Sequence, residues 1–303
     1  MNSEPASTVL TLADTGGWLR EGKPWQAEDP FFALLGEVVE SSPLPGIQRA
    51  AMRSRSVAAT YLTAHVSAGG LRGLKQATWP TSLLGFNVTP SLGEEAARLC
   101  DRLTVPAQEI GVVDTVRVDG DRWFGHNTGI SSLQAVMSQA WPDPEPPVSA
   151  AVFGAAGSLR ATVSALAHWG VESIVILCQG VTARRRLRDW LDREWLGAGI
   201  VSVRVTDPDR DDADGDKRTP RLCVVCLPPG EEITPYLSGD DAAAPGLILD
   251  PRCGAQAAAY PNLPPTTVTV GGEPVLVLQC GFSFVWWFGP PVPWDDIRRA
   301  VSL

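Results

Sequence analysis

The chain has 303 residues, of which 44% are hydrophobic, and a formal net charge of −9. This length suits two modest domains or one large domain. The acidic balance argues against nucleic acid or an anionic membrane surface as a partner. No apolar run reaches the ~18 residues of a membrane span, and the amino-terminal sequence lacks the features of a secretory signal. We therefore expect a cytoplasmic protein.

Six cysteines lie mostly inside apolar runs, which is typical of reduced, buried thiols. Cys223 and Cys226 have the two-residue gap of a metal or redox pair. They share one apolar run, however, and neither a second pair nor a histidine cluster accompanies them. The sequence therefore predicts no metal site.

In the first half of the chain, apolar runs alternate with segments of helical periodicity. We expect strands at 31–39 and 83–89, helices over most of 46–66 and over 94–103, and a hairpin at 111–127. Ser91 and Glu94 have the spacing of a capping box, in which each side chain satisfies an amide at the helix start. This alternation predicts an α/β domain.

Residues 141–149 contain four prolines and two acids and are typical of a linker. After this linker we expect strands at 148–154, 173–179, 199–205, 221–228 and 246–251, with helices at 159–170 and 183–195. Residues 206–218 are strongly acidic and indicate an exposed, mobile loop. Strands that alternate with helices in this way predict a doubly wound parallel sheet.

A glycine turn follows the first strand of this second region and opens a helix, which is the context of a dinucleotide-binding turn. Ala156 occupies the position where glycine lets the backbone approach a pyrophosphate. Gln179 ends the next strand, where an NAD site carries an acid and an NADP site an arginine. Arg184 and the two arginines after it could reach back to a phosphate, or could be the solvated face of a helix. The candidate cofactor residues are Gly154, Ala156, Gly157, Ser158, Gln179 and Arg184.

Six segments resemble, in chain order, the shikimate dehydrogenase family, which also includes quinate dehydrogenases. They are LLGEVVESSPLPGIQRAAM (34–52), GFNVTPSLGEE (85–95), IGVVDTV (110–116), GHNTG (125–129), VFGAAGSLRA (152–161) and VLVLQCGFSFVWWFG (275–289). The resemblance implies an α/β fold with a substrate domain, a doubly wound Rossmann domain and a ligand cleft between them. We expect the substrate domain at 1–142, the Rossmann domain at 148–272, and a carboxyl-terminal helical segment at 273–303 that returns to the substrate domain.

The resemblance also implies NADP-linked interconversion of a ring hydroxyl and a ketone, in which a lysine and an aspartate handle the proton. These two positions are Gly93 and Gly129 here, so we expect a divergent member that lacks both catalytic residues. Leu44 replaces a serine of the family's carboxylate-binding loop, and Asp114 replaces an asparagine that contacts the ring. The predicted substrate-binding residues are Ser42, Leu44, Asn87, Thr89, Asn127 and Gln279.

Two residues are candidates for proton transfer. Asp114 could act as an acid or base if burial raises its pKa, or it could be an ordinary hydrogen-bonded carboxylate. His126 directly precedes Asn127 and could take part in proton transfer, although a lone loop histidine is often simply solvated.

From these losses we expect a protein repurposed as a cofactor-independent, non-redox enzyme. It would be an isomerase, lyase or cyclase that acts on an apolar small molecule in the interdomain cleft. One alternative is an NADP-dependent dehydrogenase with a different substrate. Another is a non-catalytic small-molecule-binding regulator related to quinate-pathway repressors. The expected partner is a small molecule, with no nucleic acid or membrane, and the chain is expected to be a monomer or homodimer.

Overall fold

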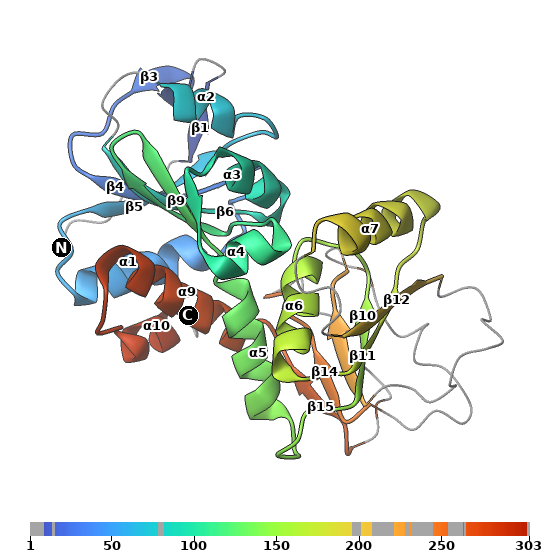
Figure 1. Ribbon diagram of the computed structural model, residues 1–303. Coiled ribbons are helices and arrows are strands. Elements are labelled where there is room, and N and C mark those ends of the chain that lie inside the picture. Colours follow the sequence, from blue (N-terminus) through green and yellow to red (C-terminus); the bar gives the residue numbers. More distant parts are fainter. Residues whose placement is uncertain are drawn as a thin grey trace. The chain divides into compact units, whose positions relative to one another are not determined.

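The computed structural model describes residues 9–13, 16–77, 82–195, 201–207, 221–227, 231, 245–253, 263 and 265–301. The chain divides into two compact units. Figure 1 shows the ribbon with colours that follow the sequence. The first unit contains residues 1–128 and 277–303, and the second contains residues 129–276. Most of the expected loop at 206–218 lies outside the described residues.

Within the described residues, the first unit holds a nine-stranded mixed sheet in the order β3-β2-β1-β5-β4-β6-β8-β9-β7. Its strands are β1 (Leu10–Leu12), β2 (Trp18–Arg20), β3 (Lys23–Trp25), β4 (Phe31–Gly36), β5 (Thr60–His65), β6 (Leu83–Val88), β7 (Arg102–Leu103), β8 (Thr115–Asp119) and β9 (Arg122–His126). Strands β5, β4 and β6 are parallel, and β8 and β9 form the expected antiparallel hairpin. Strand β4 is buried over its whole length, as an apolar central strand should be.

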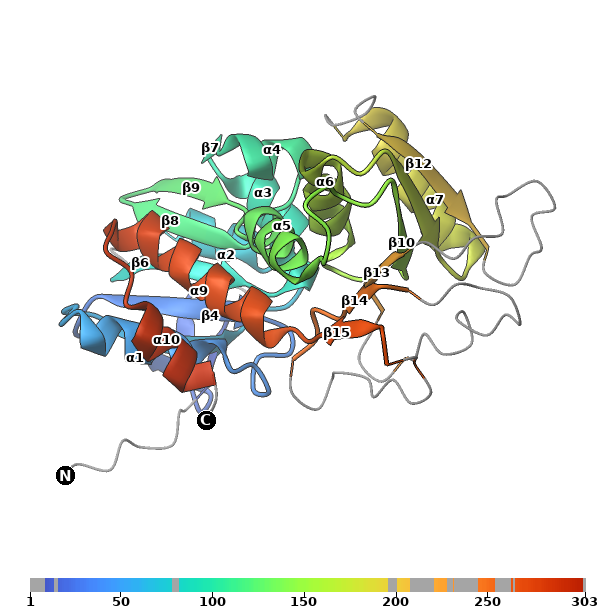
Figure 2. The same ribbon diagram turned by 90° about the horizontal axis from the view of Figure 1, so that it is seen from below.

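The helices of the first unit are α1 (Leu44–Ser54), α2 (Leu71–Gln76), α3 (Gly93–Leu99), α4 (Val105–Ile110), α9 (Glu273–Phe288) and α10 (Trp294–Val301). Helix α9 begins at the end of the second unit, and from residue 277 onward it belongs to the first. Figure 2 shows α1, α9 and α10 side by side along one face of the sheet. Residues from the sheet and its neighbouring helices form one apolar core that includes Leu10, Phe31, Leu35, Phe86, Leu92 and Val116.

The second unit is built around a parallel sheet in the order β12-β11-β10-β13-β14-β15. Its elements are α5 (Gly129–Ala140), β10 (Ser149–Phe153), α6 (Leu159–Trp169), β11 (Ser173–Leu177), α7 (Val181–Arg193), β12 (Ser202–Thr206), β13 (Leu222–Val225), β14 (Leu247–Leu249) and β15 (Val268–Val270). This strand order is doubly wound, because the chain moves outward from β10 in both directions. The predicted α/β fold, with a mixed sheet and a Rossmann-like parallel sheet, is confirmed.

Two local predictions are wrong. Residues 60–65 form strand β5 rather than the end of a helix, because α1 stops at Ser54 and a β-prone sequence follows. The capping box is also absent, since Ser91 lies in a short 3-10 turn at Pro90–Leu92 and its hydroxyl pairs with Thr89 Oγ1 at 3.2 Å. In the described part of the chain, no helix combines the length and apolarity that a membrane span requires.

Candidate functional site

One edge of the first unit's sheet gathers most of the residues predicted to bind substrate. The parallel strands β4, β5 and β6 end there, β8 starts there, and β9 returns to it, so we name it the substrate edge. Loops at such an edge carry ligand sites in many α/β proteins. The predicted residues at or beside it are Ser42 and Leu44 after β4, Asn87 and Thr89 at the end of β6, Asp114 before β8, and His126 and Asn127 at the end of β9. Gln279 lies on α9, and its side-chain amide has no hydrogen-bond partner among the described residues.

Asp114 holds a partly buried carboxylate in a dense set of donors. Its oxygens accept hydrogen bonds from the backbone N–H of Thr128 at 2.8 and 3.0 Å and from the Thr128 hydroxyl at 3.0 Å. The Thr115 hydroxyl donates a further bond at 2.8 Å. Burial raises the pKa of Asp114, and the bonds from Thr128 and Thr115 oppose this rise. The carboxylate is therefore held in one orientation and its proton affinity is increased.

His126 lies beside Asp114, whose backbone N–H donates to the His126 carbonyl at 3.1 Å. The imidazole Nδ1 is 2.9 Å from Thr104 Oγ1, and the ring stacks on Trp286 with centroids 5.1 Å apart. Burial lowers the pKa of His126, while the Asp114 charge raises it. Because Nε2 has no hydrogen-bond partner among the described residues, that atom can exchange a proton with a ligand.

Asn87 is held inside a polar network rather than left open. Its Oδ1 accepts a bond from the Tyr61 hydroxyl at 2.8 Å, and its Nδ2 donates to Thr115 Oγ1 at 2.9 Å and Ser283 Oγ at 3.1 Å. Only 5% of Asn87 is exposed. The network connects β5, β6, β8 and α9, and it reaches Asp114 through Thr115. Asn87 therefore helps to hold the residues around Asp114 in place.

Gly93 begins α3 in a space too small for a side chain. A Cβ atom at this position would lie 2.7 Å from Val112 Cγ1 and 3.0 Å from the Val113 carbonyl oxygen. The Val113 N–H donates to the Gly93 carbonyl at 3.1 Å, which holds the two segments together. The Val112 side chain and the Val113 carbonyl therefore occupy the volume that a side chain at 93 would need.

The glycine turn lies at the carboxyl end of β10 in the second unit. Gly154 has a φ of +96°, and a Cβ atom there would lie 2.3 Å from the Cys226 carbonyl oxygen, so only glycine fits. The backbone N–H groups of Ala155, Gly157 and Ser158 have no hydrogen-bond partner among the described residues. They lie just before the eleven-residue helix α6, an arrangement suited to binding phosphate oxygens.

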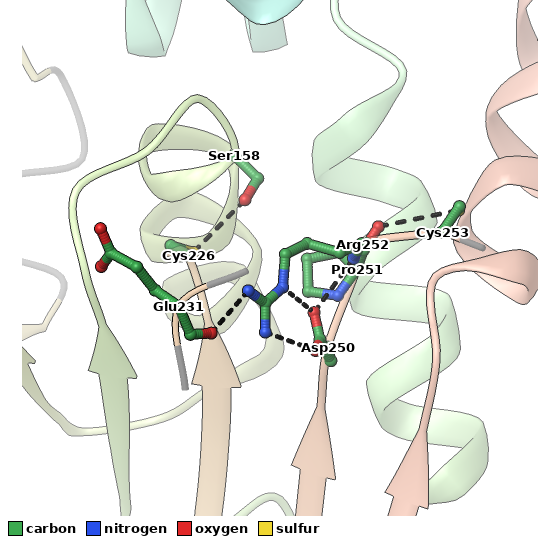
Figure 3. Close-up of polar contacts among 7 residues, drawn as sticks. All are labelled: Ser158, Cys226, Glu231, Asp250, Pro251, Arg252 and Cys253. Carbon is green, nitrogen blue, oxygen red and sulfur yellow. Dashed lines mark hydrogen bonds and ion pairs between the residues drawn. The ribbon is translucent and has the colours of Figure 1, made fainter. Parts of the chain in front are cut away.

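Figure 3 shows two polar groups at the carboxyl ends of β13 and β14, close to this turn. The Ser158 hydroxyl donates to Cys226 Sγ at 3.4 Å. The Arg252 guanidinium makes two 2.8 Å bonds to the carboxylate of Asp250 and donates to the Glu231 carbonyl at 2.8 Å. The sequence analysis missed this buried ion pair, although the spacing of an aspartate and an arginine after an apolar run was visible. The pair anchors the loop that follows β14.

A cavity of about 550 Å³ lies at the carboxyl end of β12, against α7. It is lined by Val181, Arg184, Arg185, Arg188, Asp189, Val205, Thr206 and Asp207. Arg184 is bound to Asp207 at 2.8 Å and to the Cys178 carbonyl at 2.9 Å. Arg185, by contrast, is exposed and has no partner among the described residues. The sequence analysis named Arg184, but Arg185 is the guanidinium that remains available for an anion.

The described residues show no group of three or more His, Cys, Asp or Glu side chains arranged to hold a metal ion. All six cysteines are free thiols, and burial raises the pKa of Cys223 to about 12. A neutral thiol is a poor metal ligand and a poor nucleophile.

A doubly wound sheet with free amides at its first glycine turn defines the class of nucleotide-binding α/β proteins. Residues 34–116 match the family model described as "Shikimate dehydrogenase substrate binding domain". A shikimate dehydrogenase (NADP(+)) of Methanopyrus kandleri is 30% identical over 287 residues, which cover 91% of this chain and 96% of the relative. The chain therefore belongs to the shikimate dehydrogenase family.

Solved structures agree on the fold. A shikimate 5-dehydrogenase from Mycobacterium fortuitum superposes with a TM-score of 0.69 at 24% identity, and the match covers 91% of this chain and 99% of that one. A shikimate 5-dehydrogenase from Listeria monocytogenes, in complex with shikimate and NAD, has a TM-score of 0.69 at 17% identity and covers 90% and 96%.

These comparisons correct three expectations. The predicted cofactor-independent isomerase, lyase or cyclase is wrong, because the relative aligned over 91% of the chain is an NADP-dependent oxidoreductase. The leaning towards a non-redox enzyme and the expected lack of a cofactor are wrong for the same reason. The error came from giving two missing side chains more weight than the whole-chain resemblance. A glycine turn of this kind can bind phosphate through its backbone amides, which do not depend on the side chains present.

Proposed function

We propose that this protein is an NADP(H)-dependent oxidoreductase that interconverts an alcohol and a ketone on a substrate other than shikimate. The observation that carries the proposal is that two groups suited to phosphate lie at the carboxyl edge of the second unit's sheet. Free amides at the glycine turn and the exposed Arg185 in the cavity beside β12 lie at that one edge. The Methanopyrus relative, named for NADP(+), supports the same coenzyme.

The residues present fit such a coenzyme. Amides of Ala155, Gly157 and Ser158 would bind the pyrophosphate, and Ala156 keeps its own N–H bonded to the Cys226 carbonyl at 2.8 Å. Arg185 would bind the 2′-phosphate, with Arg184 held behind it by Asp207. When bound, the coenzyme supplies or accepts the hydride.

We infer that the proton is handled by His126 and Asp114. The positions at which the family carries lysine and aspartate are Gly93 and Gly129 here, and neither can transfer a proton. As the alcohol is oxidised, His126 Nε2 takes the hydroxyl proton while hydride leaves the carbon. Asp114, held by Thr128 and Thr115, stabilises the imidazolium that forms. In the reverse direction the imidazolium returns the proton to the new alkoxide.

The proposal is tested by comparing Arg185→Ala with Arg186→Ala. Arg186 is exposed on α7 but does not line the cavity, so it is a matched control for charge. Quenching of tryptophan fluorescence by NADPH and by NADH would give the two affinities. Loss of the charge-assisted bonds predicts NADPH binding about ten-fold weaker in Arg185→Ala, with NADH binding nearly unchanged. Equal effects of both variants, or none, would contradict the assignment.

A further inference from the structure

The substrate edge of the first unit carries an excess of negative charge. The loops that meet there are residues 37–43, 66–70, 89–95, 111–114 and 126–128. Their acidic residues are Glu37, Glu40, Glu94, Glu95 and Asp114, and their only basic residue is His126. A ligand that bears a negative charge would therefore meet carboxylates on most sides of this edge.

The nearest further base is His65, the last residue of β5, and it is already paired. His65 Nε2 lies 2.5 Å from Glu40 Oε1, so the Glu40 carboxylate would balance a positive charge on the imidazole. Arg98 is on the following helix and pairs with Glu94 at 3.7 Å. Arg72 lies on α2, with its backbone N–H bonded to Glu95 at 3.3 Å, and its side chain is directed to solvent.

The loop after β4 offers few donors to an anion. The Ser42 hydroxyl accepts a bond from the Leu44 N–H at 3.4 Å, which occupies that backbone donor. Leu44 offers an apolar side chain where a hydroxyl would donate. Gly93 leaves no room for a cation, because residues 112–113 fill the space beside it. A carboxylate on the substrate would find no lysine or arginine in these loops, which makes its desolvation costly.

The same edge offers several groups that suit hydroxyl and carbonyl oxygens. Gln279 has an amide without a partner among the described residues, and His126 has an open Nε2. Asp114 accepts hydrogen bonds and is partly exposed. Groups of this kind bind the hydroxyls of a polyol and need no positive charge.

We infer that the substrate is an uncharged polyhydroxylated alcohol or ketone that lacks a carboxylate. This inference rests on the proposed function, since it concerns the substrate of the same redox site. In the forward step, a carbon–hydrogen bond of the alcohol breaks and its hydride reduces NADP+. The hydroxyl proton passes to His126, and the product is the corresponding ketone.

Shikimate and its methyl ester form a matched pair of probes that differ in one charge. Reduction of NADP+ would be followed by absorbance for each, and binding to the NADP-saturated protein by tryptophan quenching. We expect the ester to exceed the acid by about ten-fold or more in kcat/KM or, if neither is turned over, in affinity. Equal or better use of the acid would overturn the inference. So would the failure of the ester and of uncharged cyclic polyols to bind at millimolar concentration.

A variant that restores a donor and removes a charge sharpens the test. In Leu44→Ser with Glu40→Gln, we expect the ratio of ester to acid to fall by about ten-fold, because the loop regains capacity for an anion. Glu172→Gln, which removes an exposed charge from the second unit, should leave the ratio unchanged. An unchanged ratio in the double variant would contradict the account. Failure of NADPH to bind would reject the proposed function instead, while the ester-to-acid ratio in binding would still test the substrate class.

Discussion

The two sheet edges of this molecule would recognise their ligands in different ways. In the second unit the proposed coenzyme contacts are the backbone amides of Ala155, Gly157 and Ser158, which do not depend on the side chains present. In the first unit the proposed substrate contacts are side chains, so residues such as Gly93 and Asp114 set the charge of the substrate edge. Backbone recognition therefore tolerates sequence change that side-chain recognition does not.

Proton transfer at the substrate edge should depend on His126. We expect His126→Asn to lower kcat by about 10²- to 10⁴-fold, the usual contribution of general acid–base catalysis. Asp114 raises the pKa of His126, so Asp114→Asn should move the acid limb of the rate profile to lower pH. Steady-state kinetics across pH would measure both effects. An unshifted limb in Asp114→Asn would contradict the pairing, and a fully active His126→Asn would contradict the base.

At the second edge, Gly154→Ala should damage the turn through its backbone. The φ of +96° and the 2.3 Å approach to the Cys226 carbonyl predict a loss of about 3 kcal/mol or more in the free energy of unfolding. Gly180→Ala is the matched control, because Gly180 has a φ of +83° but no atom within 4 Å of its Cβ position. It should lose only about 1 kcal/mol. Urea unfolding would measure both, and equal losses would show that the close approach contributes nothing.

A lysine placed at position 93 should not add charge to the substrate edge. The contacts of a Cβ with Val112 and Val113 predict that Gly93→Lys loses about 1–3 kcal/mol of stability. Gly46→Ala is the control, since Gly46 lies in α1 with nothing near its Cβ position and should gain up to about 1 kcal/mol. Chemical unfolding would compare the two. A Gly93→Lys protein as stable as the wild type would show that the site can reopen.

The smallest effect concerns stability against pH. Burial lowers the pKa of His126 from 6.5, so its contribution to stability is present above 6.5 and is lost as pH falls from there through the lowered value. Asp114 has the opposite sign, because its raised pKa gives a contribution that is lost as pH rises from 3.8 through the raised value. We expect His126→Gln to make the loss near pH 6 shallower by about 1 kcal/mol or less. Urea unfolding at a series of pH values would detect it, and a curve unchanged from the wild type would contradict the burial of this histidine.

Much of the fold could be predicted because it depends on periodicity. The apolar runs that became β10, β11 and β13 and the helix over 159–169 are set by local pattern and burial. Strand β5 was missed because it begins only a few residues after α1 ends at Ser54, and its pairing with β4 and β1 is a tertiary contact. Tertiary pairing of this kind is not visible in a local window.

The site was less predictable for a related reason. The sequence identified Asp114 and His126 as candidates, but the bonds from Thr128 and Thr104 that orient them come from other strands and loops. Asn87 was expected to face a ligand, and its engagement with Tyr61 and Ser283 could be seen only in three dimensions. The cofactor was mispredicted because amides without partners leave no trace in the sequence.

We expect the glycine turn to serve an NADP-dependent reaction, and calorimetric titration of the wild-type protein with NADPH and NADH would test this. Binding of NADPH should saturate at micromolar concentration and be tighter than binding of NADH by about ten-fold because of the 2′-phosphate. No heat of binding with either coenzyme at millimolar concentration would contradict it.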